Sequence, residues 1–165
     1  MKAKKIIEKL LTTKAKGKVL EAKCGFNSYF QDNETIEEVV AMDFSEEALK
    51  RYSHPGRTRY LYDMEQVVQG ERLPFEDGEF NTVGVFFGVN YLSDPMPVYN
   101  DFFRILDNSG NLLIVGNPGS GYADLQVAPF DPDRTAIQLA EVGFEASVTD
   151  IQMHRENQFG HYYLV

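Results

Sequence analysis

The chain has 165 residues, of which 43% are hydrophobic, so it is long enough for one domain with a substantial core spanning residues 1–165. Its formal net charge of -9 and isoelectric point of about 4.8 argue against a nucleic-acid partner, because phosphate binding needs a positive surface. No apolar run approaches the roughly 20 residues of a membrane span, and one cysteine cannot form a disulfide framework, which predicts a cytoplasmic protein.

The N-terminal segment differs in charge from the rest of the chain. Residues 1–18 carry seven lysines and one glutamate. Ile6, Ile7, Leu10 and Leu11 lie at helical spacing, so we expect an amphipathic helix near residues 2–13, within a basic segment 1–17. The lysines provide either a solvated helix face or a patch that touches an acidic surface or a membrane.

Short apolar runs and turn residues alternate along the rest of the chain. The predicted strands are 19–22, 39–42, 58–62, 80–87, 112–115, 145–153 and 162–165. The predicted helices are 28–32, 45–52, 94–106 and 131–141. Ser45 can cap the second of these helices, and Gly143 ends the last one. Strands that alternate with helices indicate a three-layer α/β sandwich around a mostly parallel sheet.

The stretch at 18–27, KVLEAKCGFN, contains the first predicted strand and the loop that follows it. An apolar run ends at Glu21 and breaks into a turn that contains Gly25 and Asn27, as when the first parallel strand of a βαβ unit leads into a nucleotide-binding loop. Cys24 within this turn is either a nucleophile or a small packed residue. The histidines show no metal-ligand spacing, so no metal site is predicted.

Further motifs follow the loop in a fixed order. They are Asp43 after the second strand, Asp63 after the third, LPFEDGEF at 73–80, YLSDP at 91–95, RIL at 104–106, Gly110 and LLI at 112–114. With these motifs the chain resembles the class I S-adenosylmethionine-dependent methyltransferases of the small-molecule type. The resemblance implies a Rossmann-like fold with a seven-stranded sheet in the order 3-2-1-4-5-7-6, whose last strand is antiparallel.

The resemblance also implies a set of residues that bind S-adenosylmethionine. They are Glu21, Gly25, Asp43, Phe44, Asp63, Met64 and Phe86. Asp43 would accept hydrogen bonds from the ribose hydroxyls, and Asp63 would accept one from the adenine amino group. Phe44 would cover one face of the adenine, while Glu21 and Gly25 would line the methionine end.

The loop departs from the family pattern of an acidic residue followed by three alternating glycines, because Lys23 and Asn27 flank Gly25. A positive φ at Lys23 would cost roughly 1–2 kcal/mol. An ammonium some 5 Å from the sulfonium of the cofactor would weaken binding roughly a hundredfold at an effective dielectric of about 20. We therefore expect Lys23 to turn away and pair with Glu21 or with the carboxylate of the cofactor.

Two functions follow from these observations. The first is methyl transfer from S-adenosylmethionine to a small or medium-sized acceptor. The alternative is a catalytically inactive methyltransferase-fold subunit that binds a ligand or a protein partner, as the altered loop suggests. Dinucleotide binding is disfavoured because the Gly-x-Gly-x-x-Gly spacing is absent. The sequence assigns no catalytic residue and no oligomeric state, and it offers the loop 118–129 as a cover for the site.

Overall fold

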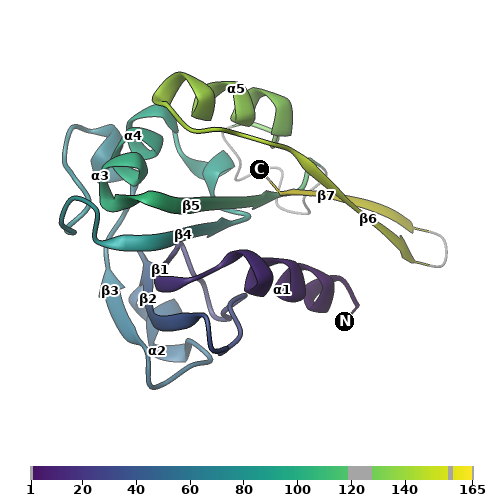
Figure 1. The fold of residues 1–165 in the computed structure, drawn as a ribbon, viewed down its shortest axis with the longest axis horizontal. Coiled ribbons are helices and arrows are strands. Elements are labelled where there is room, and N and C mark those ends of the chain that lie inside the picture. The colour runs from purple at the N-terminus through teal and green to yellow at the C-terminus, as the bar shows by residue number, and fades with distance from the viewer. Residues whose placement is uncertain (1, 119–127, 156–157, 165) are drawn as a thin grey trace.

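The computed structural model describes residues 2–118, 128–155 and 158–164, and within them the strands form one seven-stranded sheet (Figure 1). The strands are β1 (Gly17–Ala22), β2 (Ile36–Asp43), β3 (Thr58–Leu61), β4 (Phe80–Phe86), β5 (Leu106–Gly116), β6 (Thr149–Arg155) and β7 (Gln158–Leu164). Their order is β3-β2-β1-β4-β5-β7-β6, which confirms the predicted order. The first five strands are parallel, and β7 is antiparallel to both β5 and β6.

Helices cover both faces of the sheet (Figure 1). They are α1 (Lys2–Lys14), α2 (Glu46–Arg51), α3 (Glu65–Val68), α4 (Met96–Ile105) and α5 (Pro132–Val142). The helices α1 and α2 pack on one face, and α3, α4 and α5 pack on the other. The predicted caps are present, since the Ser45 hydroxyl accepts from the Ala48 amide and Gly143 ends α5 with a φ of 123°. Among the described residues, none of the helices is both long and apolar enough to cross a membrane.

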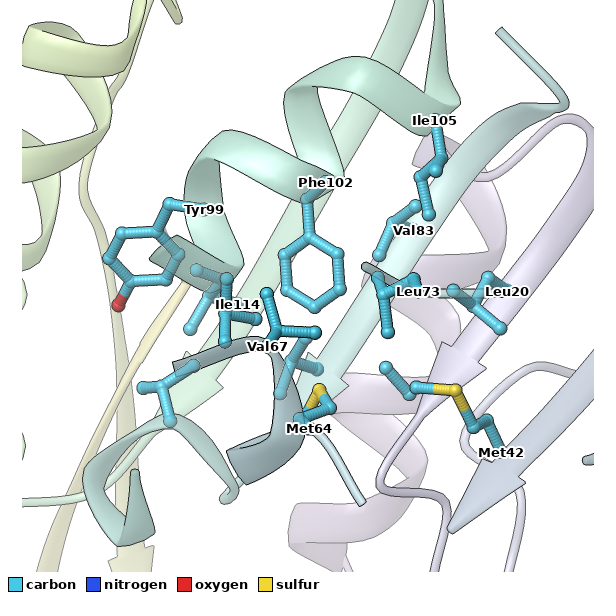
Figure 2. Close-up of a cluster of buried hydrophobic side chains, with 14 of the residues drawn as sticks. Leu20, Met42, Met64, Val67, Leu73, Val83, Tyr99, Phe102, Ile105 and Ile114 are labelled. Carbon is cyan, nitrogen blue, oxygen red and sulfur yellow. The ribbon is translucent and has the colours of Figure 1, made fainter. Parts of the chain in front are cut away.

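The larger part of the core lies between the sheet and the face that α3 and α4 cover. Figure 2 shows Phe102 of α4 and Val67 of α3 pointing toward Leu20, Val83 and Ile114, which come from three neighbouring strands. All of these side chains are buried. Burying a side chain of this size stabilises the fold by roughly 1.5–3 kcal/mol. This packing gives the carboxyl ends of the strands a rigid base.

The segment after β1 differs from the prediction, because residues 23–35 contain turns and bends and the helix expected at 28–32 is absent. Side-chain acceptors bind the backbone amides of this segment. The Tyr29 amide donates to the Glu21 carboxylate and the Phe30 amide donates to the Ser28 hydroxyl. Such bonds compete with helical hydrogen bonds. The loop at 23–27 is therefore not followed by a helix whose N-terminus could face a ligand.

Smaller differences concern the segments before and after β4 and the last two strands, which are Thr149–Arg155 and Gln158–Leu164 where 145–153 and 162–165 were predicted. The short helix α3 was not predicted. The strand β5 begins at Leu106 and not at 112, because the polar residues 107–110, which looked like a turn, continue the strand. The β4–β5 register shifts between Phe80 and Thr82, which accommodates this irregular start.

Candidate functional site

A small pocket lies at the carboxyl ends of β2 and β3. Its lining residues are Lys23, Asp43, Phe44, Tyr62, Asp63, Met64 and Leu92. Four of the residues predicted to bind the cofactor therefore come together here, namely Asp43, Phe44, Asp63 and Met64. Adjacent parallel strands bring their carboxyl ends to the same edge of the sheet, which explains the convergence.

Asp43 ends β2 and organises the loop on one side of the pocket. Its side chain is buried, and its Oδ2 accepts a hydrogen bond from the Gly25 amide at 2.9 Å. Its Oδ1 accepts another from the Ser45 amide, also at 2.9 Å. An ionised carboxylate has about four acceptor positions, so Asp43 retains capacity for hydroxyl donors of a ligand.

The other side of the pocket is formed after β3. The Oδ1 of Asp63 accepts a hydrogen bond from the Glu65 amide at 3.0 Å, in the first turn of α3. Met64 is buried beside it, whereas Phe44 is 56% exposed. An exposed ring beside two carboxylates suits a flat heterocycle with polar edges, because the ring offers a stacking face and the carboxylates accept hydrogen bonds.

Lys23 also lines the pocket. Its backbone φ is 57°, so the expected left-handed strain is present. Its Nζ donates to the Gly88 carbonyl oxygen at 3.5 Å and lies 4.6 Å from the centre of the Tyr91 ring. It also lies 5.7 Å from the centre of the Phe44 ring. The expected pairing with Glu21 is wrong, because the side chain extends toward Gly88 and Tyr91.

Burial and the neighbouring carboxylates shift the pKa of Lys23 in opposite directions. Burial lowers the pKa of its ammonium, while Asp43, Asp63 and Glu65 raise it. The side chain thus places a partly desolvated cation among carboxylates and aromatic rings. The pocket keeps a free volume of only about 10 Å³, whereas pockets for small molecules usually measure roughly 300–1,000 Å³.

Glu21 is not among the residues that line this pocket, and its place at the methionine end stays a prediction. Its buried carboxylate accepts hydrogen bonds from the Ser28 hydroxyl at 2.7 Å and the Tyr29 amide at 2.8 Å. The Tyr52 hydroxyl donates a third at 2.5 Å. Arg57 donates to the Ser28 hydroxyl and the Tyr52 hydroxyl from the outer side of this network.

This network fixes the loop and does not line the pocket. Burial raises the pKa of the Glu21 carboxyl, while the hydrogen bonds from Tyr52, Tyr29 and Ser28 and the charge of Arg57 lower it. The roles of Ser28, Tyr52 and Arg57 were not predicted from the sequence. Ser28 lies in the segment expected as a short helix, Tyr52 ends the helix expected at 45–52, and Arg57 lies just before β3, so no shared motif marks them as one network.

Gly25 and Phe86 complete the set of predicted residues. Gly25 has a φ of 59°, and a Cβ at this position would meet nothing within 4 Å, so the backbone there is open to a ligand. Phe86 packs in the core, with ring centres 5.0 Å from Tyr29 and 5.3 Å from Phe30. Gly25 therefore borders the pocket through its bond to Asp43, and Phe86 lies away from it.

The other candidate sites are less suited to catalysis or to binding a cofactor. Cys24 is buried, and burial raises the pKa of its thiol, which disfavours a nucleophilic thiolate and supports the packing interpretation. The described part of the chain contains no cluster of His, Cys, Asp and Glu suited to a metal. A hollow of about 770 Å³ lies beside Leu106–Leu113, at the amino end of β5, opposite to the carboxylates. Of the loop 118–129, expected as a cover, residues 119–127 lie outside the described residues.

The pocket fits an adenosyl group in part. Its carboxylates and exposed ring provide acceptors for ribose and adenine donors and a face for the base. The pocket itself keeps only about 10 Å³, too little for either half of S-adenosylmethionine, and a wider hollow of about 520 Å³ that shares Phe44, Tyr62 and Asp63 lies beside it. A ligand that enters the pocket needs lining side chains, Lys23 among them, to move.

Comparisons with known proteins place the chain among methyltransferases. It is 33% identical over 78 residues to a mitochondrial 2-methoxy-6-polyprenyl-1,4-benzoquinol methylase of Leishmania donovani, which covers 47% of this chain and 27% of that protein. It is 32% identical over 79 residues to a demethylmenaquinone methyltransferase of Listeria welshimeri, with 47% and 33% covered. These matches thus span a third or less of the curated relatives.

A solved structure shares the fold over nearly the whole chain. A SAM-dependent methyltransferase of Leishmania major superimposes with a TM-score of 0.76 at 10% identity, covering 99% of this chain and 72% of that one. A family model matches residues 2–128, and the chain therefore belongs to the ubiE/COQ5 methyltransferase family.

Proposed function

We propose that the protein binds an S-adenosyl ligand at the carboxyl ends of β2 and β3 and transfers a methyl group to a small or medium-sized acceptor. The observation that carries this proposal is the convergence of Asp43, Asp63 and Phe44 on one pocket. Membership of the ubiE/COQ5 methyltransferase family supports it.

The adenosine half of the ligand is the part that the pocket residues suit. Asp43 would accept hydrogen bonds from ribose hydroxyls with the acceptor positions that Gly25 and Ser45 leave free. Asp63 would accept from the amino group of adenine, and Phe44 would cover one face of the base. Hydrogen bonds to charged groups contribute roughly 1.5–3 kcal/mol each, so loss of either carboxylate should be measurable.

The acceptor class comes from the relatives. The names of these two curated relatives specify a benzoquinol and a demethylmenaquinone. A hydroquinone is therefore the first acceptor to test. When bound, S-adenosylmethionine supplies an activated methyl group on its sulfonium. Transfer from a sulfonium depends mainly on positioning, and no residue here is assigned as a base.

A second candidate is a binding or partner subunit without catalysis. Two observations favour it. The Lys23 side chain occupies space next to Phe44 and Tyr91 that the ligand would need, and residues 23–35 form no helix to support the loop. A subunit that binds another ligand or a protein partner does not need the adenosyl pocket, so the two candidates differ in turnover and can also differ in adenosyl binding.

Calorimetry with S-adenosylmethionine and S-adenosylhomocysteine, followed by a transfer assay with a methyl-labelled donor and a demethylated naphthoquinol, tests these proposals. Binding with label transfer supports methyltransferase activity. Binding without transfer to this acceptor or to a panel of small phenols supports the second candidate. If neither ligand binds at millimolar concentration, the adenosyl-binding proposal is refuted.

A further inference from the structure

The Lys23 side chain follows a path that depends on a distant glycine. A Cβ built on Gly88 would lie 3.0 Å from the Lys23 Cδ and 3.4 Å from its Cβ. The absence of a side chain at Gly88 thus leaves room for the Lys23 stem, which ends with the ammonium at the Gly88 carbonyl oxygen. The path crosses the space between the loop at 23–27 and the start of the helical turn at Val89–Tyr91.

The ammonium ends in surroundings that suit an organic cation. The rings of Tyr91 and Phe44 lie 4.6 and 5.7 Å from the Nζ, within the range of cation–π attraction. The Gly88 carbonyl accepts a hydrogen bond from it. Asp43 and Asp63 add negative charge from the strand ends. Aromatic cages of this kind recognise quaternary ammonium groups, and a sulfonium is a cation of similar charge and size.

We propose that Lys23 determines the ligand specificity of this pocket. Its ammonium takes the place of a sulfonium, so the pocket prefers the neutral thioether S-adenosylhomocysteine over S-adenosylmethionine. This inference rests on the proposed function, which places the adenosine half at Asp43 and Asp63 and hence the sulfur on the side of Lys23. Because Lys23 is part of the chain, it competes at the high effective concentration of a tethered group.

Charge repulsion sets the size of the preference. When the stem moves aside for a ligand, an ammonium that stays about 5 Å from the sulfonium weakens binding of S-adenosylmethionine roughly a hundredfold at an effective dielectric of about 20. The thioether escapes this penalty because its sulfur is uncharged. Both ligands share the steric cost of displacing the Lys23 stem, so that cost cancels in the ratio of their dissociation constants. The ratio of the two dissociation constants therefore measures the charge repulsion by Lys23. The absolute dissociation constants also contain the steric cost of moving its side chain.

Two substitutions separate charge from space. Lys23→Met keeps an unbranched chain of similar length and removes the charge. Lys23→Gly removes both, and it also suits the positive φ at this position. Lys50→Met is the matched control, because Lys50 is an exposed lysine of α2 that pairs with Glu46 and does not line the pocket. Thermal unfolding verifies that each variant is folded before calorimetry with the two ligands.

We expect the wild type and Lys50→Met to bind S-adenosylhomocysteine about a hundredfold more tightly than S-adenosylmethionine. In Lys23→Met and Lys23→Gly the two affinities should approach each other, and Lys23→Gly should bind both ligands more tightly than the wild type. A wild type that binds both ligands equally, or a preference that survives Lys23→Met, would overturn the role of Lys23 and leave adenosyl binding intact. Absence of binding in the wild type and in every variant would instead refute the proposed function.

Discussion

Replacing Glu21 tests how the loop that borders the pocket is held. Three donors, the Ser28 hydroxyl, the Tyr29 amide and the Tyr52 hydroxyl, converge on this buried carboxylate. Glu21→Ala leaves the Tyr29 amide and the Tyr52 hydroxyl without this acceptor, while the Ser28 hydroxyl can still donate to the Phe30 carbonyl oxygen at 3.1 Å. Glu21→Gln keeps the shape and one acceptor oxygen, but it removes the charge and turns an amide group toward the donors.

The expected cost follows from the burial of this group. Removing one partner from a buried charged network typically costs about 3–5 kcal/mol, which we expect for Glu21→Ala. Losing charge assistance alone costs about 1.5–3 kcal/mol, which we expect for Glu21→Gln. For a protein of this size, 1 kcal/mol corresponds to roughly 2–4 °C, so the Tm of Glu21→Ala should fall by roughly 6–20 °C.

Urea unfolding measures these differences, and Glu47→Gln is the control. Glu47 is 66% exposed on α2 and pairs with Arg51 at 3.8 Å, so its substitution should change the free energy of unfolding by less than about 1 kcal/mol. At a temperature where Glu21→Gln is folded, its affinity for S-adenosylhomocysteine should equal that of the wild type, because Glu21 does not line the pocket. A change in affinity without a change in stability would refute this interpretation and place Glu21 at the ligand.

Three further predictions concern the pocket, the core and the pH dependence of stability. Asp43→Asn should weaken binding of S-adenosylhomocysteine roughly ten- to a hundredfold in calorimetry, and an unchanged affinity would place the ligand elsewhere. Gly84→Ala should lower the free energy of unfolding by about 1–3 kcal/mol, because its Cβ would lie 2.6 Å from ring atoms of Phe30 and Phe86; a variant as stable as the wild type would contradict this packing. Because burial lowers the pKa of Lys23 below 10.5, the unfolded state binds more protons just below that pH, so the wild type should gain stability relative to Lys23→Met as the pH rises toward 10.5. Parallel stability profiles of the two proteins would contradict the buried position of the ammonium.

The sequence predicted the parts of the structure that depend on local patterns. Apolar runs that alternate with helical periodicity indicated the α/β sandwich, and the resemblance to the class I methyltransferases implied the observed strand order. Asp43 and Asp63 could be placed at one edge because each follows a parallel strand and the two strands pair directly. Ser45 and Gly143 could be assigned because caps and stops are set by a few adjacent residues.

The parts that the sequence did not predict depend on contacts between distant residues. The direction of Glu21 is set by Tyr52, which lies 31 residues away, and this network replaced the expected short helix. The direction of Lys23 is set by Gly88, 65 residues away, which leaves space for its stem. Neither contact can be recognised from a periodic sequence pattern, because each joins residues that lie far apart in the sequence.

The most direct test of the central claim, that an adenosyl group binds at the ends of β2 and β3, is a titration of the wild-type protein with S-adenosylhomocysteine followed by amide NMR. We expect saturable shifts of the amides of Gly25, Asp43, Phe44, Asp63 and Met64. Shifts confined to residues 106–113 beside the hollow at the amino end of β5, or no shifts at millimolar ligand, would contradict it.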